Sequence, residues 1–398
     1  REEKRRFWYT DLGPVIYRTD AQIFVLKSVA WDQFEAYEQW FQLEHAKSLD
    51  EFRAILDDQR IPMFNIGYAD RDGNIMYFWY GTVPDLPHPA HGETAVHARR
   101  SADMWTTVHP VRELPQLTNP PGGYVMNSNS APYYTNLHVP MDRAAFPDHF
   151  IENRFSLRSQ HSMLLIHNDR KFSLEDVVAL KHSQRALTAD RVKDDVIRIA
   201  RTSNHAAELE NAIDVLQAWD NSTARESTSQ DNFAQRWRTS DPITTPRGIR
   251  DEARALEALR TAAQEVEKRY GALDVPWGEV HRLRQDDGTD VAVGGSENYM
   301  GAFRIVRYRD DKDGKRKAYS GDSWVFAVEF GDVPRAYTVV AYSESEYPDS
   351  EHYSDQAALF AGEQMKPARF TQADIKANAI TTYRPGKEPT RTVHDRTD

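Results

Sequence analysis

Two strand-rich stretches bracket a long helical stretch, and this order constrains the fold more than any other feature of the chain. Near the N-terminus, strand-like runs over residues 64–69 and 74–79 are joined by a segment, residues 70–73, that is typical of hairpin turns. Near the C-terminus, strand-like runs return at residues 324–330 and 336–342. Strands that are separated from helices along the chain predict an α+β fold. Periodicity leaves open whether the two strand groups meet in one sheet.

Helix start and stop signals are clear at three places. Ser48 and Glu51 form a capping-box sequence, which predicts a short helix with apolar residues on one face. Ser173 is a predicted N-cap for a second helix. Apolar residues spaced by three and four predict a long helix over residues 256–270, ended by Gly271.

The same patterns predict four consecutive regions. They are a strand-rich core part (1–83), long loops (84–170), a helical region (171–275) and a strand-rich part that closes the core (276–398). Within the third region, residues 221–248 are rich in Ser, Thr and Pro and are predicted to be a surface linker.

Composition excludes several functions. The 398 residues are 40% hydrophobic and 11% aromatic, as expected for a chain with a sizeable core. A formal net charge of −11 argues against sequence-independent nucleic-acid binding, and we find no run of about 18 apolar residues that could span a membrane. The absence of cysteine excludes disulfides, thiolate metal sites and a cysteine nucleophile.

Two clusters of polar residues suggest other chemistry but are weak signals. His88, His91, Glu93 and His97 have spacing that could suggest a zinc site, but neighbouring Pro and Gly residues favour a solvated loop. A second cluster could supply the paired carboxylates of a glycoside hydrolase, although closeness in sequence does not fix separation in space. It contains Asp349, Glu351, His352 and Asp355.

A series of short segments, taken in order, resembles the β subunit of penicillin-acylase-type amidohydrolases, which include acyl-homoserine-lactone, cephalosporin and aculeacin acylases. Each segment alone is a weak signal, but their order along nearly the whole chain is specific. The segments are residues 2–15, 68–75, 123–129, 277–281, 294–296, 301–304, 321–324 and 350–356. The resemblance implies the C-terminal part of the β subunit of an αββα N-terminal-nucleophile hydrolase with a helical insertion.

This family resemblance implies amide hydrolysis by an N-terminal Ser whose own α-amine is the general base. Arg1 cannot serve as that nucleophile, so we expect the Ser, part of the acyl pocket and the α subunit to lie outside this sequence. The expected substrate is an amide between an apolar acyl chain and a polar amine, such as an acyl-homoserine lactone, a β-lactam side chain or a lipopeptide. An alternative is a non-catalytic scaffold or binding subunit with the same fold.

The resemblance also implies a periplasmic or secreted location. It implies no required cofactor, and it allows a structural calcium ion whose ligands we cannot assign in this chain. The segment around residues 350–356 departs from the family pattern, because Glu344 and Ser345 stand where Gln-Ser is usual.

Four residues match family site positions. Asn129 matches the oxyanion-hole Asn, a neutral donor suited to a developing negative charge, and Arg158 matches the Arg that orients it, with Arg154 as a competing match. Trp40 and Phe64 match apolar acyl-pocket positions. The ordinary alternatives are a turn Asn, a surface ion pair and two core aromatics.

Overall fold

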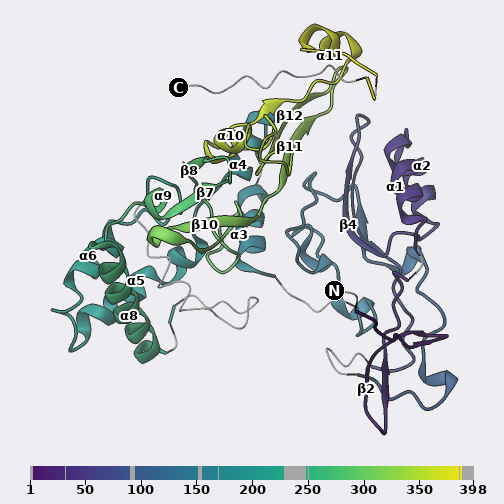
Figure 1. The fold of residues 1–398 in the computed structure, drawn as a ribbon, viewed down its shortest axis with the longest axis horizontal. Coiled ribbons are helices and arrows are strands. Elements are labelled where there is room, and N and C mark those ends of the chain that lie inside the picture. The colour runs from purple at the N-terminus through teal and green to yellow at the C-terminus, as the bar shows by residue number, and fades with distance from the viewer. Residues whose placement is uncertain are drawn as a thin grey trace.

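The structure is a computed structural model, and it describes residues 3–31, 33–89, 95–150, 155–168, 170–227, 248–249, 251–384 and 386–387. In these residues, four small sheets and a group of helices follow one another along the chain (Figure 1). The predicted α+β class is confirmed. The division into four regions is not tested and stays a prediction.

The N-terminal part contains two sheets and two helices. A small meander precedes a helix pair that packs on a second sheet of order β4-β5-β6. The elements are β1 (Tyr9–Thr10), β2 (Gly13–Arg18), β3 (Ile23–Val25), α1 (Ala36–His45), α2 (Leu49–Leu56), β4 (Met63–Ala69), β5 (Ile75–Gly81) and β6 (Gln116–Thr118).

Strand β5 is the centre of this part because both of its faces are buried. Tyr80 lies on the face toward the helices, where its hydroxyl donates to the carbonyl of Leu56 (2.7 Å). Trp79 lies on the opposite face and contacts the ring of Phe150 at a centroid distance of 5.3 Å. Burying an aromatic or aliphatic side chain contributes about 1.5–3 kcal/mol, so the near-continuous apolar run of β5 anchors the sheet.

Side chains from residues 95–150, within the region predicted to form long loops, cover the second face of β5. Leu114 and Tyr133 of this stretch are almost fully buried. The stretch holds short 3₁₀ helices as well as β6, and α3 follows it. The bounds are η1 (Ser101–Asp103), η2 (Val111–Glu113), η3 (Pro132–Tyr134), η4 (Arg143–Ala145) and α3 (Leu157–Ile166).

The helical region packs around its own apolar cluster. Ser173 caps α4 by accepting a hydrogen bond from the backbone of Asp176, and Gly271 ends α8 in the left-handed conformation, as predicted. Most of the predicted linker, residues 228–247, lies outside the described residues. The helices are α4 (Leu174–Lys181), α5 (Leu187–Thr202), α6 (Glu210–Ala218) and α8 (Glu252–Tyr270).

The C-terminal part has two more sheets, of order β8-β7-β10-β9 and β11-β12-β13, which share one apolar cluster with α10. A final helix, α11, lies beyond them. The elements are α9 (Trp277–Val280), β7 (His281–Arg284), β8 (Asp290–Ala292), β9 (Val306–Asp310), η5 (Lys312–Gly314), β10 (Arg316–Gly321), β11 (Trp324–Glu329), β12 (Arg335–Val340), α10 (Ala357–Ala361), β13 (Lys366–Pro367) and α11 (Gln372–Asn378).

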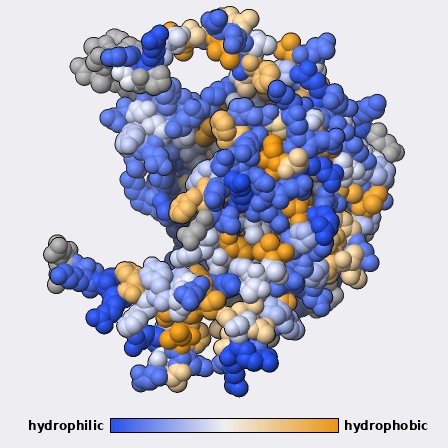
Figure 2. Space-filling view, turned by 90° about the vertical axis from the view of Figure 1, so that its right-hand side faces the viewer, coloured by the Kyte–Doolittle hydropathy of each residue, from blue (hydrophilic) through white to orange (hydrophobic). Residues whose placement is uncertain are grey.

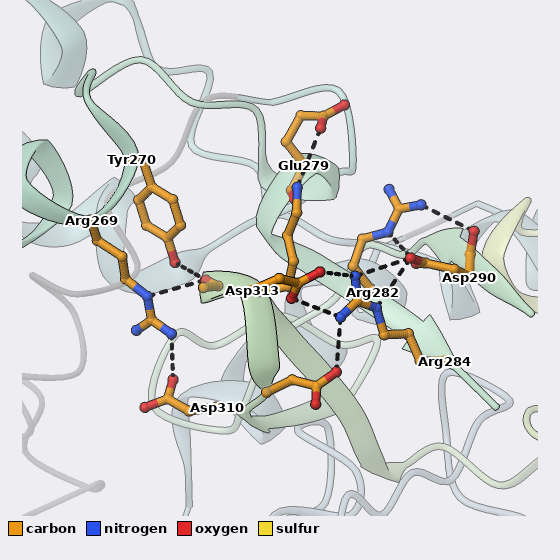
Figure 3. Close-up of polar contacts among 11 residues, drawn as sticks. Arg269, Tyr270, Glu279, Arg282, Arg284, Asp290, Asp310 and Asp313 are labelled. Atoms are coloured by element: carbon orange, nitrogen blue, oxygen red, sulfur yellow. Dashed lines mark hydrogen bonds and ion pairs between the residues drawn. The ribbon is translucent and has the colours of Figure 1, made fainter. Parts of the chain in front are cut away.

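An arginine holds the β9–β10 hairpin loop against the neighbouring strands (Figure 3). Arg284 binds both carboxylate oxygens of Asp313 at 3.0 Å, and it also binds Asp311 (2.9 Å) and Asp290. Arg269 and Tyr270, at the end of α8, donate to the carbonyl of Gly314 in the same loop. The β9–β10 hairpin loop is therefore fixed by a charge network.

The two strand groups do not share a sheet within the described part of the chain. Strand β4 is hydrogen-bonded only to β5 there, and β11 only to β12. In Figure 1 the β11–β12 hairpin lies beside the β4–β5 hairpin without pairing with it. Each group therefore has an edge strand whose outer side pairs with no other described strand.

Candidate active site

The loop that carries Asn129 is shaped by the side chain of Asn127. Asn127 Oδ1 accepts a hydrogen bond from the backbone N–H of Asn129 (2.8 Å), and its Nδ2 donates to the carbonyl of Ser130 (3.0 Å). These bonds close a tight turn in which Asn129 has a φ of +57°. Asn tolerates this left-handed conformation better than most residues do, so the residue type fits its backbone.

Arg158 fixes the orientation of the Asn129 amide. It lies in the first turn of α3, where Ser156 is the N-cap, and its Nη2 donates to Asn129 Oδ1 (2.8 Å) and to the carbonyl of Ser128 (2.5 Å). Because a guanidinium can only donate, Oδ1 must be the bound atom. The amide Nδ2 has no acceptor among the residues that the structure describes, so it stays available as a donor.

A buried tyrosine joins this loop to the N-terminal sheet. Tyr77 of β5 donates its hydroxyl hydrogen to Asn65 Oδ1 (2.6 Å) and accepts from Asn127 Nδ2 (3.2 Å). Burial raises the pKa of Tyr77, so its hydroxyl stays protonated. The Asn129 turn is thereby anchored to β4 and β5.

An ion pair between the helical region and the C-terminal part faces the same region. Lys181, the last residue of α4, binds Asp322 Oδ2 at 2.5 Å, and its Nζ lies 5.0 Å from the ring centroid of Phe303. Asp322 Oδ2 also accepts from the backbone N–H of Ile305 (3.3 Å). Burial lowers the pKa of Lys181, and the charge of Asp322 opposes that shift.

These groups line one cavity of about 370 Å³. Three of its wall segments fall within sequence segments that resemble acylases, residues 123–129, 301–304 and 321–324, which are far apart in the chain. The cavity therefore brings separate motifs together. Its lining residues are Asn65, Ile66, Gly67, Tyr77, Val125, Met126, Asn127, Ser128, Asn129, Arg158, Lys181, Phe303 and Asp322.

Comparison with protein families matches residues 1–377 to the penicillin amidase family. The chain belongs to the penicillin amidase family. Similar proteins include an acyl-homoserine lactone acylase PvdQ of Pseudomonas savastanoi pv. phaseolicola, 25% identical over 95% of this chain and 55% of that protein. The aculeacin-A acylase of Actinoplanes utahensis is 22% identical over 96% of this chain and 56% of that protein. The chain thus spans about half the length of these relatives.

The fold of this penicillin amidase family member matches that of a thermostable penicillin G acylase from Alcaligenes faecalis. The TM-score is 0.62 at 17% sequence identity, over 97% of this chain and 79% of that chain. The expected N-terminal-nucleophile hydrolase fold is therefore confirmed, as is the resemblance deduced from the ordered motifs.

Trp40 and Phe64 lie together, but they do not line the Asn129 cavity. Their rings meet edge to face at a centroid distance of 4.9 Å. Phe64 is paired with Tyr80 and so faces the helix side of β4, whereas its neighbour Asn65 faces the cavity. Trp40 packs on the N-terminal apolar cluster, and Phe64 is 51% exposed. Their role as acyl-pocket residues stays a prediction.

The competing polar clusters supply no metal-binding group in the described part of the chain. No group of three or more His, Asp or Glu residues there is arranged to hold a metal ion, while His91, Glu93 and Arg154 lie outside the described residues. His352 forms exposed ion pairs with Glu351 (3.2 Å) and Asp355 (2.9 Å). None of the described helices is long and apolar enough to cross a membrane.

The departure at Glu344 has a structural explanation. Glu344 Oε1 accepts from Gln356 Nε2 (2.7 Å) and pairs with Lys366 (3.2 Å). These two bonds lower the pKa of Glu344. Its carboxylate therefore fastens the loop to β13, and in this position an acidic residue gains a cationic partner that Gln would not attract.

Sequence reasoning assigned no role to Asn65, Tyr77, Lys181 or Asp322. Asp322 lies in a segment that resembles acylases, so the sequence did contain a signal that could have placed it in the site. Lys181 had no such signal, because a basic residue in the last turn of a helix is explained equally well by the helix dipole. Only the tertiary structure shows that it faces the cavity.

Proposed function

We propose that this chain is part of an amidohydrolase that cleaves an amide between an apolar acyl group and a polar amine, with Asn129 as an oxyanion donor. The observation that carries the proposal is the bond from Arg158 to Asn129 Oδ1 at the cavity wall. It leaves Nδ2, a neutral donor, free for an oxygen atom of the substrate. A donor held in place before the reaction stabilises negative charge without having to reorganise.

In this proposal the nucleophile is an N-terminal Ser supplied by a segment outside these 398 residues. Its Oγ attacks the amide carbon, and the carbonyl electrons move to the oxygen, which Asn129 Nδ2 stabilises. The C–N bond then breaks, the amine leaves with a proton, and water hydrolyses the acyl-enzyme ester. The names of the relatives, which are those of acylases, support amide hydrolysis, and this chain covers about half of their length.

The open sheet edges support the docking of such a segment. Met63 of β4 is 70% exposed, and Trp324 and Phe326 of β11 are also mostly exposed. Around α1, Tyr37 and Phe41 are exposed as well, and Figure 2 shows hydrophobic areas on the face that includes this side of the molecule. Unpaired edges with apolar side chains favour added strands and partner surfaces. We propose the remaining β segment and an α subunit as their occupants.

Two further parts of the proposal rest on the family alone. They are a periplasmic or secreted location and a structural calcium ion, for which this chain suggests no ligands. The scaffold alternative would gain support if the complete protein hydrolysed no acyl amide.

The test is Asn129→Ala in the complete protein. Loss of one oxyanion donor lowers kcat by about 10²–10³ while the fold stays intact. Asn378→Ala is a matched control, because Asn378 is exposed and, among the described residues, bonds only within α11. Turnover is measured on an N-octanoyl amide, and folding by circular dichroism. An Asn129→Ala variant with undiminished kcat removes Asn129 from the mechanism.

A further inference from the structure

We propose that Lys181 is a specificity-determining residue that binds a carboxylate on the amine side of the substrate. This inference rests on the proposed amide hydrolysis and adds a substrate class to it. The proposal begins from the position of Lys181 in the same cavity wall as Asn129 and Arg158.

The charges of the cavity favour an anionic ligand. Arg158 and Lys181 each carry a positive charge, and Asp322 is the one carboxylate among the described lining residues. The remaining positive charge is costly to keep in a partly buried site unless a ligand or a reaction intermediate matches it. An oxyanion at Asn129 neutralises this positive charge only during the reaction. A carboxylate on the substrate neutralises it for as long as the substrate is bound.

Lys181 is held in position and still has donors to offer. Its side chain is 26% exposed, and Asp322 and the ring of Phe303 fix its ammonium group. An ammonium group has three N–H donors, and the bond to Asp322 uses one of them. Within the described residues the other two have no protein acceptor. Because the side chain is already ordered, binding a ligand there costs little additional entropy.

The charge of Lys181 favours the amine side of the substrate at its part of the cavity wall. The polar residues Asn65, Tyr77 and Asp322 line the same cavity. An apolar acyl chain against a charged ammonium group would remove water from the charge without replacing its hydrogen bonds. The polar amine half of the substrate can replace them.

The ordinary alternative is that the ion pair only fastens α4 to the turn before β11. In that case removal of the ion pair lowers the stability of the fold and lowers the affinity for all ligands equally. A role in specificity instead changes the affinity for charged ligands and leaves neutral ligands of the same shape unaffected. Two ligands of the same shape, one charged and one neutral, therefore distinguish the structural role from the specificity role.

The experiment compares N-octanoyl-L-homoserine with N-octanoyl-L-homoserinamide on the complete protein, by calorimetric binding and by KM and kcat. We expect the wild type to bind the carboxylate ligand at least about tenfold more tightly than the amide ligand, which is the contribution of one charge-assisted hydrogen bond. Lys181→Met should reduce this preference to less than about twofold, through weaker binding of the carboxylate ligand alone. Lys181→Arg should retain most of it, and exposed Lys171→Met should retain all of it.

Each outcome decides one of the two proposals. Equal affinities in the wild type, or an equal loss for both ligands in Lys181→Met, overturn the role of Lys181. Preference for the carboxylate without hydrolysis of either ligand supports Lys181 and contradicts the amidohydrolase. If Lys181→Met does not fold, the double variant Lys181→Met with Asp322→Asn leaves no unpaired carboxylate, and the same loss of preference is expected from it.

Discussion

His182 is predicted to make the folded chain sensitive to acid. It follows α4 directly and is buried, and Arg304 Nη1 lies 2.7 Å from its Nδ1. Because Arg304 can only donate, Nδ1 must be unprotonated, which places the single ring proton on Nε2. Burial first, and then the charges of Arg304 and Lys181, lower the pKa of His182 to about 3.

The size of the effect follows from proton linkage. In the unfolded chain His182 takes up a proton near its ordinary pKa of 6.5, whereas the folded chain resists protonation down to about 3. The unfolded state therefore binds more protons between these values, and stability falls as pH decreases through this window. At pH 5 the pKa of the unfolded state is about 1.5 units above the pH, so the loss is about 2 kcal/mol.

The assay is urea unfolding of the wild type and His182→Asn at pH 7 and pH 5. Asn can still accept the hydrogen bond from Arg304 but does not titrate. We expect the free energy of unfolding of the wild type to fall by about 2 kcal/mol more than that of the variant. Exposed His97→Asn should behave like the wild type. Equal pH dependence for the wild type and His182→Asn would refute the reasoning.

Two further predictions concern buried and networked side chains. Gln39 is fully buried, and its Oε1 accepts from two backbone N–H groups, both at 3.0 Å. Gln39→Leu should therefore lower the free energy of urea unfolding by about 2–4 kcal/mol, whereas Gln42→Leu on the same helix should cost much less. Hydrogen bonds from Arg284 lower the pKa values of Asp311 and Asp313. The two ionised carboxylates therefore stabilise the fold at pH values above the ordinary Asp pKa, and this stabilisation is lost as the pH falls below that pKa. Arg284→Met should raise both pKa values in a carboxyl NMR titration, and unchanged values would contradict the network in Figure 3.

Local signals predicted the parts of the fold whose cause is local. Ser48 caps α2 by accepting from the backbone of Glu51 (3.2 Å), as the capping-box sequence predicted. The turn at residues 70–73 is closed by Asp70, whose Oδ1 accepts from the backbone of Asp72 and Asn74. In each case the stabilising side chain bonds to backbone groups only a few residues away, so the local sequence is sufficient to predict the element.

Helices α1 and α3 were missed because polar residues occupy their buried faces. Gln39 of α1 is fully buried and serves backbone donors, so it interrupts the apolar pattern. In α3, Ser159, His161 and Ser162 are all nearly or fully buried. Apolar periodicity detects a helix only when its buried face is apolar. Burying these polar groups is acceptable because hydrogen-bond partners from distant segments satisfy them.

Those distant partners make α3 the element that assembles the candidate site. Toward the N-terminal part, Ser162 Oγ lies 2.9 Å from Ser128 Oγ, and Arg158 binds the carbonyl of Ser128. Toward the C-terminal part, His161 Nδ1 lies 2.7 Å from the carbonyl oxygen of Gly301, two residues before Phe303 in the cavity wall. One helix thus sets the position of the Asn129 turn relative to the wall that carries Lys181. A sequence can show each motif separately, but their alignment depends on polar contacts that no periodicity reveals.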